Sequence, residues 1–227
     1  MISVLTLTYK RHHLLEEAIQ SFILQNKEEC EMVIINDNPN VDYILENYSN
    51  IKIINYKFRF ESISDKIEWG YKQCKNEYIY RLDDDDLLGP NGLDIAMNNI
   101  IENPNYDVYR SSGMYFFCEN NYEGIKSNIN NGNIYSKSYL NRITFPKKSI
   151  GEDADITFAH NANIYENSEN LPTMIYRWGM NTLHISGMGK VSNEIVLRKA
   201  DDVLDSTMGK IILNPNYKED YYSKIIW

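Results

Sequence analysis

The stretch EYIYRLDDDDLLGPNGL (residues 77–93) places four consecutive aspartates directly after an apolar run that is typical of a β-strand. Adjacent carboxylates repel one another, by about 4 kcal/mol per pair of unit charges at a spacing of about 4 Å and an effective dielectric constant near 20. A divalent cation would relieve this repulsion, because Mg²⁺ and Mn²⁺ prefer oxygen ligands. Since alternate side chains of an extended segment share a face, we expect Asp83 and Asp85 to point one way and Asp84 and Asp86 the other.

Other interpretations of the aspartate run are a solvated acidic turn, a calcium loop and a phosphatase site. An EF-hand loop starting at Asp83 would need a ligand at its fifth position and glycine at its sixth, where the sequence has Leu87 and Leu88. A phosphatase of the haloacid dehalogenase type also has a D-x-D after a strand, but after the first strand rather than the fourth. The place of the run at a strand end favours a ligand site, and we keep the phosphatase as an alternative.

The chain before the aspartates alternates between two kinds of hydrophobic pattern. Segments typical of strands are residues 2–8, 31–37, 51–56 and 77–82, and segments typical of amphipathic helices are residues 14–23, 41–48 and 63–74. This alternation predicts an α/β fold with a doubly wound, mostly parallel sheet. In such sheets ligands bind at the carboxyl ends of the strands, which is where the aspartates fall.

The chain after the aspartates predicts a mixed second half. Pro90 can open a helix that runs to about residue 101, because proline is tolerated in the first turn. Residues 106–124 are typical of two strands with Gly and Asn breaks, residues 151–162 of a helix with acids in its first turn, and residues 173–182 of a strand and loop. We therefore expect mixed or antiparallel pairing in this part.

The length and charge of the chain limit its organisation and partners. The 227 residues suffice for one large domain, which we place at residues 1–190. Residues 191–227 are predicted to form a helical tail that packs on the domain or makes an oligomer contact. A net charge of −9 argues against a broad nucleic-acid or anionic-membrane surface, because such partners need a basic field.

The cysteines and the first residues favour a cytoplasmic location. Cys30, Cys74 and Cys118 are widely spaced and form no C-x-x-C pair, which is typical of reduced thiols. The opening MISVLTLTYKRHH has no basic leader and no small-residue cleavage pattern, so we expect no secretory signal. No apolar run approaches the roughly 18 to 20 residues of a membrane span.

A series of short motifs follows along residues 2–185. They are SVLTLTYKR (3–11), IINDNPN (34–40), SISDKIEWG (62–70), RLDDDDLLGP (81–90), GEDADITFAH (151–160) and YRWGMNT (176–182). In content and order they resemble the motifs S-V-x-x-P-T-Y-N-R, V-x-D-D-x-S, S-L-G-E-K-R-N-x-G, W-D-D-D-D-x-x-x-P, G-E-D and Y-x-R-H-G-x-N-T. These belong to the inverting glycosyltransferases of family 2, which have the nucleotide-sugar-binding fold called GT-A.

The resemblance implies a metal-dependent, inverting transfer of a sugar from a nucleoside diphosphate to a glycan, glycolipid or glycoprotein acceptor. The nucleotide-binding half would be residues 1–105 and the acceptor half residues 106–190. UDP is the expected carrier, with GDP and dTDP left open, and the cofactor would be Mn²⁺ or Mg²⁺. Neither the sugar, the linkage nor the acceptor follows from the sequence.

The resemblance also assigns site residues. Residues expected to bind the donor are Thr8, Tyr9, Arg11, Asp37, Lys66, Asp83, Asp84, Arg177 and Asn181. Among them Asp37 would contact the nucleotide base and Asp83 the ribose, while Asp85 would bind the metal. Lys66 and Arg177 would be phosphate partners, because positive side chains stabilise a leaving diphosphate.

Asp153 matches the catalytic base of the family. Its other interpretation is structural, because acids in the first turn of a helix, here Glu152, Asp153 and Asp155, face the positive end of the helix dipole. That environment would lower the pKa of Asp153 and weaken it as a base.

Several positions depart from the family motifs. Trp178 stands where the family has His, and His184 is the residue we expect to replace it at the metal. Leu7, Ile67 and Glu68 also replace family residues. These replacements support a competing interpretation, in which the chain is a non-catalytic sugar-nucleotide-binding module.

Overall fold

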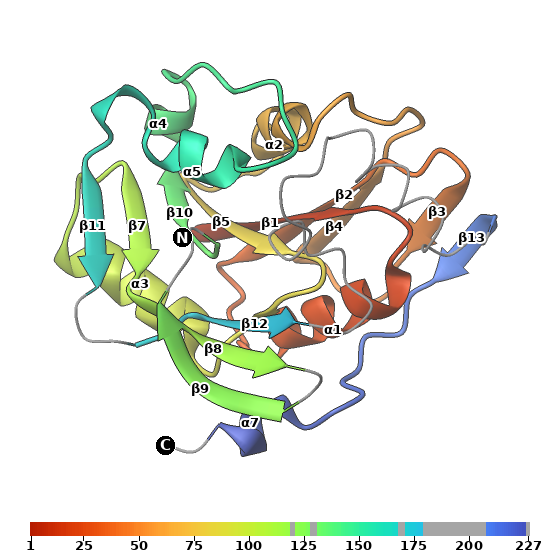
Figure 1. The fold of residues 1–227 in the computed structure, drawn as a ribbon. Helices are drawn as coiled ribbons and strands as arrows, with labels where there is room; N and C mark the ends of the chain where they lie inside the picture. Colours follow the sequence, from red (N-terminus) through yellow and green to blue (C-terminus); the bar gives the residue numbers. More distant parts are fainter. Residues whose placement is uncertain (119–120, 128–130, 168–170, 179–207, 226–227) are drawn as a thin grey trace.

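The computed structural model describes residues 1–118, 121–127, 131–167, 171–178 and 208–225. The strands of its largest sheet are β1 (Ile2–Thr8), β2 (Glu31–Asn36), β4 (Ile51–Asn55), β5 (Tyr78–Asp83), β7 (Val108–Ser111), β10 (Ile134–Ser136) and β11 (Ile164–Asn167). Their order is β11-β7-β10-β5-β1-β2-β4 (Figure 1). Strands β5, β1, β2 and β4 run parallel, whereas β10 is antiparallel to both of its neighbours. The predicted α/β fold with a mostly parallel sheet and a mixed second half is confirmed.

Helices cover both faces of this sheet. They are α1 (His12–Ile23), α2 (Ile63–Tyr71), α3 (Gly92–Glu102), α4 (Lys137–Leu140) and α5 (Glu152–Thr157), followed by the 3₁₀ turn η1 (Ala159–Asn161). Successive side chains of β1 point to opposite faces, so Val4 packs with α1 and α3, and Leu5 with α2, α4 and α5. Every residue of β1 is buried, as expected for a strand in the middle of a covered parallel sheet.

The strand order reverses at β1, and this brings the first motif next to the aspartates. The chain builds β1, β2 and β4 outward in one direction and then returns to place β5 on the other side of β1. Leu7 pairs with Asp83 in the parallel register of β1 and β5. The residues that follow Leu7 therefore lie beside the aspartates, at the point where doubly wound sheets bind ligands.

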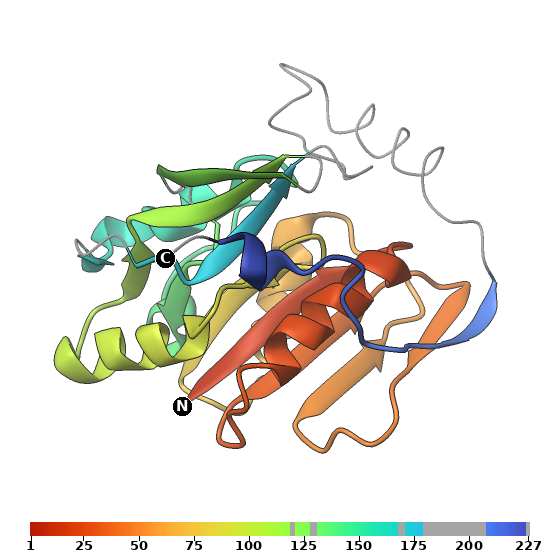
Figure 2. The ribbon, with the colours of Figure 1, turned by 90° about the horizontal axis from the view of Figure 1, so that it is seen from below.

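A smaller sheet begins directly after the aspartates. Its strands are β6 (Leu87–Leu88), β8 (Gly113–Cys118), β9 (Asn121–Ser127) and β12 (Met174–Trp178). Their order is β6-β12-β8-β9, so the aspartates form the link from the large sheet to the small one. The short helix α7 (Tyr221–Lys224) lies beside this sheet and near α1, as Figure 2 shows, and Tyr221 packs with Leu87 and Phe117.

Two predicted elements are wrong. Residues 41–48 were expected to be helical, but Val41–Ile44 form the strand β3, which pairs in parallel with β13 (Gly209–Ile212). In this segment Val41 and Tyr43 are buried while Asp42 and Ile44 are half-buried, a period of two that suits a strand. The predicted helical tail is likewise wrong for residues 208–225, which contain a strand and a single helical turn.

Among the described residues, no helix combines the length and the apolar character that crossing a bilayer requires.

Candidate functional site

The four aspartates form a turn rather than an extension of β5. The strand ends at Asp83, and the backbone N–H of Asp86 donates to the carbonyl oxygen of Asp83 at 3.2 Å. One carboxylate oxygen each from Asp83, Asp85 and Asp86 lie within 4.8 Å of one another. The expected alternation is therefore wrong for Asp86, because a turn brings its side chain round to the same side as Asp83 and Asp85.

Arg11 contacts two carboxylates of this aspartate turn (residues 83–86). Its Nη1 donates to Oδ2 of Asp85 at 2.8 Å, and its Nη2 pairs with Oδ1 of Asp84. Burial by itself would lower the pKa of Arg11, but Asp84 and Asp85 outweigh burial and raise that pKa. The predicted donor-binding residue Arg11 thus contacts the aspartate turn directly.

Burial and mutual repulsion raise pKa values at the turn. Burial raises the pKa of Asp84 to about 6, with Arg11 opposing the rise and Asp85 adding to it. Burial also raises the pKa of Asp86 well above its ordinary value, and Asp85 and Asp83 add to this rise. A hard divalent cation fits this set, because it prefers carboxylate oxygens and would offset the repulsion among them. Asp83, Asp85 and Asp86 are the residues that would hold it.

Lys66 and Asp37 form a buried pair at the ends of β1 and β2. Nζ of Lys66 lies 2.5 Å from Oδ1 of Asp37 and donates to the carbonyl oxygen of Thr8 at 2.8 Å. The backbone N–H of Phe60 donates to Oδ2 of Asp37 at 3.1 Å. Burial lowers the pKa of Lys66, and Asp37 opposes this by favouring the charged form. Lys66 therefore ties strand ends together, and in this arrangement its ammonium points at Asp37 rather than toward the aspartate turn.

An aromatic loop, residues 56–60, lies next to this pair and was not predicted from the sequence. The rings of Tyr56 and Phe60 stack with centroids 4.7 Å apart, and the guanidinium carbon of Arg59 lies 4.0 Å from the ring centroid of Tyr9. Phe58 is 73% exposed. The pattern Y-x-F-x-F at residues 56–60, directly after a predicted strand, was the available signal. The loop places aromatic surface beside Asp37, the predicted base-contacting residue.

Arg177 lies beneath the aspartate turn. Its side chain is completely buried, and its Nη1 lies 2.5 Å from Oε2 of Glu17 in α1. Its Nε donates to the carbonyl oxygen of Asp85 at 2.5 Å. Its Nε and Nη1 are occupied by protein groups, and its Nη2 is buried without a hydrogen-bond partner among the described residues. The predicted role as a phosphate partner does not match this position, because the side chain is shielded from solvent. The sequence did not indicate that Glu17 is buried beside Arg177, because a glutamate in an amphipathic helix normally faces water.

Asp153 is partly buried in the first turn of α5. Burial raises its pKa to about 8, Glu152 adds to the rise, and Arg81 opposes it. The lowering expected from the helix dipole is therefore wrong, since α5 has six residues and its dipole does not offset the loss of solvent. Among the described residues, no hydrogen-bond donor contacts the Asp153 carboxylate. A carboxyl group with a raised pKa is suited to accept and hold a proton.

Arg81 links Asp153 to the aspartate turn, and it too was missed. It lies in β5, is 6% exposed, and its Nη2 is 2.5 Å from Oδ1 of Asp83. It also acts electrostatically on Asp153 and Glu152. An arginine inside the apolar run YIYRL, two residues before the aspartates, was the signal for it.

Asn181 and His184, predicted to bind the donor and the metal, lie outside the described residues.

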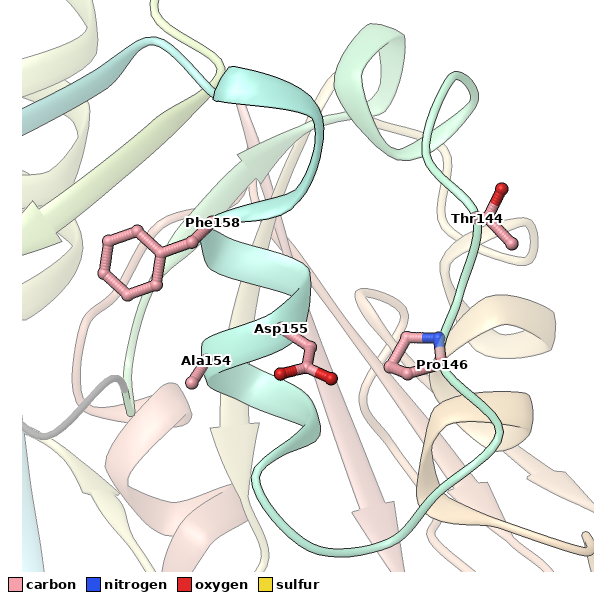
Figure 3. A pocket seen from close by; sticks show the side chains of 5 residues that line it. All are labelled: Thr144, Pro146, Ala154, Asp155 and Phe158. Atoms are coloured by element: carbon pink, nitrogen blue, oxygen red, sulfur yellow. The ribbon is translucent and has the colours of Figure 1, made fainter.

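A groove lies beside α5 on the surface. It has a volume of about 440 Å³ and is lined by Thr144, Pro146, Ala154, Asp155 and Phe158 (Figure 3). At its rim Asp155 pairs with Lys148 at 2.6 Å, and the ring of Phe158 is 55% exposed. Residues two apart on an α-helix point about 200° apart, so Asp155 faces away from Asp153.

The chain is similar to a known protein family and to curated proteins. The family model described as glycosyl transferase family 2 matches residues 3–164. An uncharacterized glycosyltransferase of Rickettsia felis is 26% identical over 115 residues, which is 48% of this chain and 19% of that protein. A second one, from Rickettsia typhi, is 26% identical over 128 residues, which is 51% of this chain and 40% of that protein. The chain thus spans less than half the length of the curated relatives it matches.

Solved structures share the fold. S. aureus TarS 1–349 in complex with UDP-GlcNAc superposes with a TM-score of 0.63 and 21% identity, over 89% of this chain and 65% of that one. The mannosyltransferase PcManGT from Pyrobaculum calidifontis, in complex with GDP-Man and Mn²⁺, gives a TM-score of 0.59 and 11% identity, over 92% of this chain and 65% of that one. At these identities the likeness concerns the fold.

Proposed function

Since this chain belongs to glycosyl transferase family 2, we propose that it transfers a sugar from a nucleoside diphosphate to an acceptor hydroxyl in a metal-dependent, inverting reaction. The observation that carries this proposal is the carboxylate cluster of Asp83, Asp85 and Asp86 at the carboxyl edge of the sheet. Asp153 interacts electrostatically with Arg81, which pairs with Asp83 of this cluster. The family match gives no support to the phosphatase alternative.

The donor would lie across the ends of β1, β2 and β5. Tyr9 and the aromatic loop at residues 56–60 would contact the base together with Asp37, whose carboxylate oxygens can each accept a further hydrogen bond. Asp83, Asp85 and Asp86 would hold Mn²⁺ or Mg²⁺, which when bound supplies positive charge to the leaving diphosphate. UDP is the preferred carrier in this proposal, in keeping with the UDP-GlcNAc complex of the structurally similar TarS.

The transfer would be a single displacement. The acceptor oxygen forms a bond to the anomeric carbon while the bond from that carbon to the diphosphate oxygen breaks, which inverts the configuration. The proton of the acceptor hydroxyl passes to Asp153. A pKa raised to about 8 suits this role, because a base whose pKa is near the working pH both loses its proton beforehand and gains one in the reaction.

The acceptor would be a glycan, glycolipid or glycoprotein, met in the cytoplasm. The groove beside α5 faces away from Asp153, so it would hold a part of the acceptor remote from the reacting hydroxyl. Phe158 offers an exposed ring on which the apolar face of a sugar can stack, and Asp155 and Thr144, which also line the groove, offer hydrogen-bonding groups. This geometry favours an extended acceptor over a single small sugar.

A thermal-shift panel of nucleotide sugars, with and without Mn²⁺, tests the proposal. A ligand that binds only the folded state adds about 2.7 kcal/mol to the free energy of unfolding at a concentration of 100 times Kd. The unfolding temperature rises as a result. We expect one sugar nucleotide to stabilise the protein only when Mn²⁺ is present, and that donor should then support transfer. No stabilisation by any sugar nucleotide would overturn the proposal. Binding without transfer or hydrolysis would favour the non-catalytic module.

A further inference from the structure

Arg177 holds two consecutive residues of the aspartate turn. Its Nε donates to the carbonyl oxygen of Asp85 at 2.5 Å, and its backbone N–H donates to Oδ1 of Asp86 at 3.1 Å. The side chain is completely buried. Both bonds come from β12, and the second occupies one carboxylate oxygen of Asp86.

The other end of Arg177 is fixed by α1 and by the C-terminal segment, residues 208–225. Nη1 lies 2.5 Å from Oε2 of Glu17 and 3.3 Å from the hydroxyl oxygen of Tyr221. The Tyr221 hydroxyl donates to Oε1 of Glu17 at 3.2 Å, and the backbone N–H of Lys218 donates to the same oxygen at 3.0 Å. Glu17 is 1% exposed and Tyr221 is 0% exposed. A continuous set of bonds therefore joins the C-terminal segment to the turn.

Stability alone is a poor explanation for this buried network. Taking a glutamate and an arginine out of water carries a large desolvation penalty, and hydrophobic side chains of similar volume often stabilise a protein as well or better. Such a pair is better explained by a requirement for one defined geometry. The group whose geometry it sets here is the aspartate turn.

The charges of the network suit a cation site. Arg11 pairs directly with the carboxylates of Asp84 and Asp85, so it competes with a cation for the same oxygens. Arg177 instead bonds a carbonyl oxygen of the turn, and the charge of its guanidinium is balanced by Glu17. It can therefore orient the turn without repelling a positive ion.

We propose that Arg177, held by Glu17 and Tyr221, is a positioning residue that sets the aspartate turn for cation binding, so that residues 208–225 belong to the metal site. This inference rests on the proposed function, because it assumes that the carboxylate cluster holds a divalent cation. It assigns a role to Tyr221, which contacts neither the cluster nor the proposed donor site directly. Loss of the Tyr221 hydroxyl should loosen the turn while the protein stays folded.

The test compares Tyr221→Phe with Tyr222→Phe. Both variants lose one hydroxyl from the same helical turn, but the Tyr222 hydroxyl donates to the carbonyl oxygen of Leu88 and has no bond to Arg177 or Glu17. Mn²⁺ affinity is measured by electron paramagnetic resonance of free Mn²⁺, and the unfolding temperature of the metal-free protein is measured in parallel. We expect Tyr221→Phe to weaken Mn²⁺ binding about fivefold, the usual effect of losing one hydrogen bond. Tyr222→Phe should stay within about twofold of wild type.

A charge variant gives a second, independent readout. Glu17→Gln keeps the shape of the side chain but leaves the Arg177 charge unbalanced near the turn, so Mn²⁺ binding should weaken more than in Tyr221→Phe, by about tenfold or more. The double variant Glu17→Gln with Arg177→Met removes the excess charge. It also removes the bond from Nε to the carbonyl oxygen of Asp85, so Mn²⁺ binding should stay weak, whereas a pure charge effect would restore it to the wild-type level.

The outcomes separate the two proposals. If wild type binds no Mn²⁺, with or without UDP, the metal-dependent function is wrong. If wild type binds Mn²⁺ and the folded Tyr221→Phe and Glu17→Gln variants bind it with the same affinity, the positioning role of Arg177 is wrong. A lower unfolding temperature with unchanged Mn²⁺ affinity would likewise overturn it and leave Arg177 as a structural residue.

Discussion

The aspartate turn and helix α5 both carry buried carboxyl groups beside Arg81, yet the protein treats their charges differently. At the turn, Arg11 donates to Asp84 and Asp85 and limits the pKa of Asp84 to about 6, whereas burial and the neighbouring carboxylates raise the pKa of Asp86 well above its ordinary value until a cation offsets their repulsion. At α5, burial and Glu152 raise the pKa of Asp153 to about 8, so this group holds a proton at neutral pH. The same residue type is thus set up to attract a cation in one place and to exchange a proton in the other.

Among the predicted effects, the largest is the loss of transfer when the carboxyl group of Asp153 in α5 is removed. Asp153→Asn removes the proton acceptor but keeps the size, so transfer should fall by about 10²- to 10⁴-fold while donor affinity is kept. In wild type the rate should rise with pH up to about 8, because Asp153 must lose its proton before it can act as a base. Steady-state rates from pH 6 to 9 and donor titrations check both. Wild-type transfer by Asp153→Asn would show that the base is another residue.

Replacing Asp85 tests the cation-binding role of the aspartate turn. Asp85→Asn removes a charge from the carboxylate cluster, and Mn²⁺-dependent donor binding should weaken by at least about 100-fold, since even indirect changes at metal sites cost up to that much. Calorimetry with and without Mn²⁺ measures this. Asp94→Asn, at an exposed position paired with Lys27, is the matched control and should bind as wild type does. Equal affinities for wild type and Asp85→Asn would remove Asp85 from the metal site.

The groove beside α5 gives a smaller effect that sharpens the comparison. Phe158→Ala removes the exposed ring from the groove, and the KM for an extended acceptor should rise about fivefold, because stacking on an aromatic ring is worth about 1 kcal/mol. The donor KM and the rate with a short acceptor should not change. A uniform loss for short and extended acceptors would argue that the groove contributes to folding and not to the acceptor.

The last expected effect is on stability, and it depends on pH. The pKa of Asp153 is about 8 in the folded protein, against about 3.9 for an unfolded aspartate. Between these two pH values the folded protein keeps a proton on Asp153 that the unfolded protein has lost. Stability therefore falls as pH rises from about 4 to 8, and the loss is complete above pH 8. Asp153→Asn should remove this loss. The unfolding temperature of the variant relative to wild type should therefore increase from about pH 4 to about pH 8, by about 2–4 °C for each kcal/mol of stability that wild type loses.

Calorimetry of the metal-free proteins at pH 5, 7 and 9 measures this gain. Asp155→Asn, in the exposed part of the same helix, serves as the control, and its difference from wild type should stay constant. A constant difference for Asp153→Asn as well would mean that the raised pKa is absent in solution.

Local patterns were sufficient to predict the half of the fold that positions the aspartates. Strands β1, β2, β4 and β5 and helices α1 and α2 follow from hydrophobic periodicity, which reports which side of each element is buried. Strand β3 was mistaken for a helix because its partner β13 lies more than 160 residues later. Pairing between distant segments is not visible in a short stretch of sequence. Hydrophobic period and residue propensity therefore could not distinguish a strand from a helix here.

Site residues divide in the same way. Asp37 and Asp85 follow parallel strands in short motifs and so lie at one edge of the sheet, while Asp153, in the first turn of α5, interacts electrostatically with Asp83. The roles of Lys66 and Arg177 depend on their partners, Asp37 and Glu17, which are distant in sequence. A positive side chain in a motif suggests a phosphate partner until the buried carboxylate that neutralises it is known. The missed residues, Arg81 and Glu17, are charged groups in apolar surroundings, which need tertiary contacts to interpret.

The contacts of Glu17 also constrain the order in which the chain can mature during synthesis. Its partners Arg177 and Tyr221 lie 160 and 204 residues later in the sequence. At about 5–20 residues per second, a ribosome needs roughly 10–40 s to reach Tyr221 after Glu17 has been added. During that interval helix α1 carries a carboxylate that its final packing would bury without a partner. Helix α1 therefore cannot complete its packing until β12 and α7 have been synthesised.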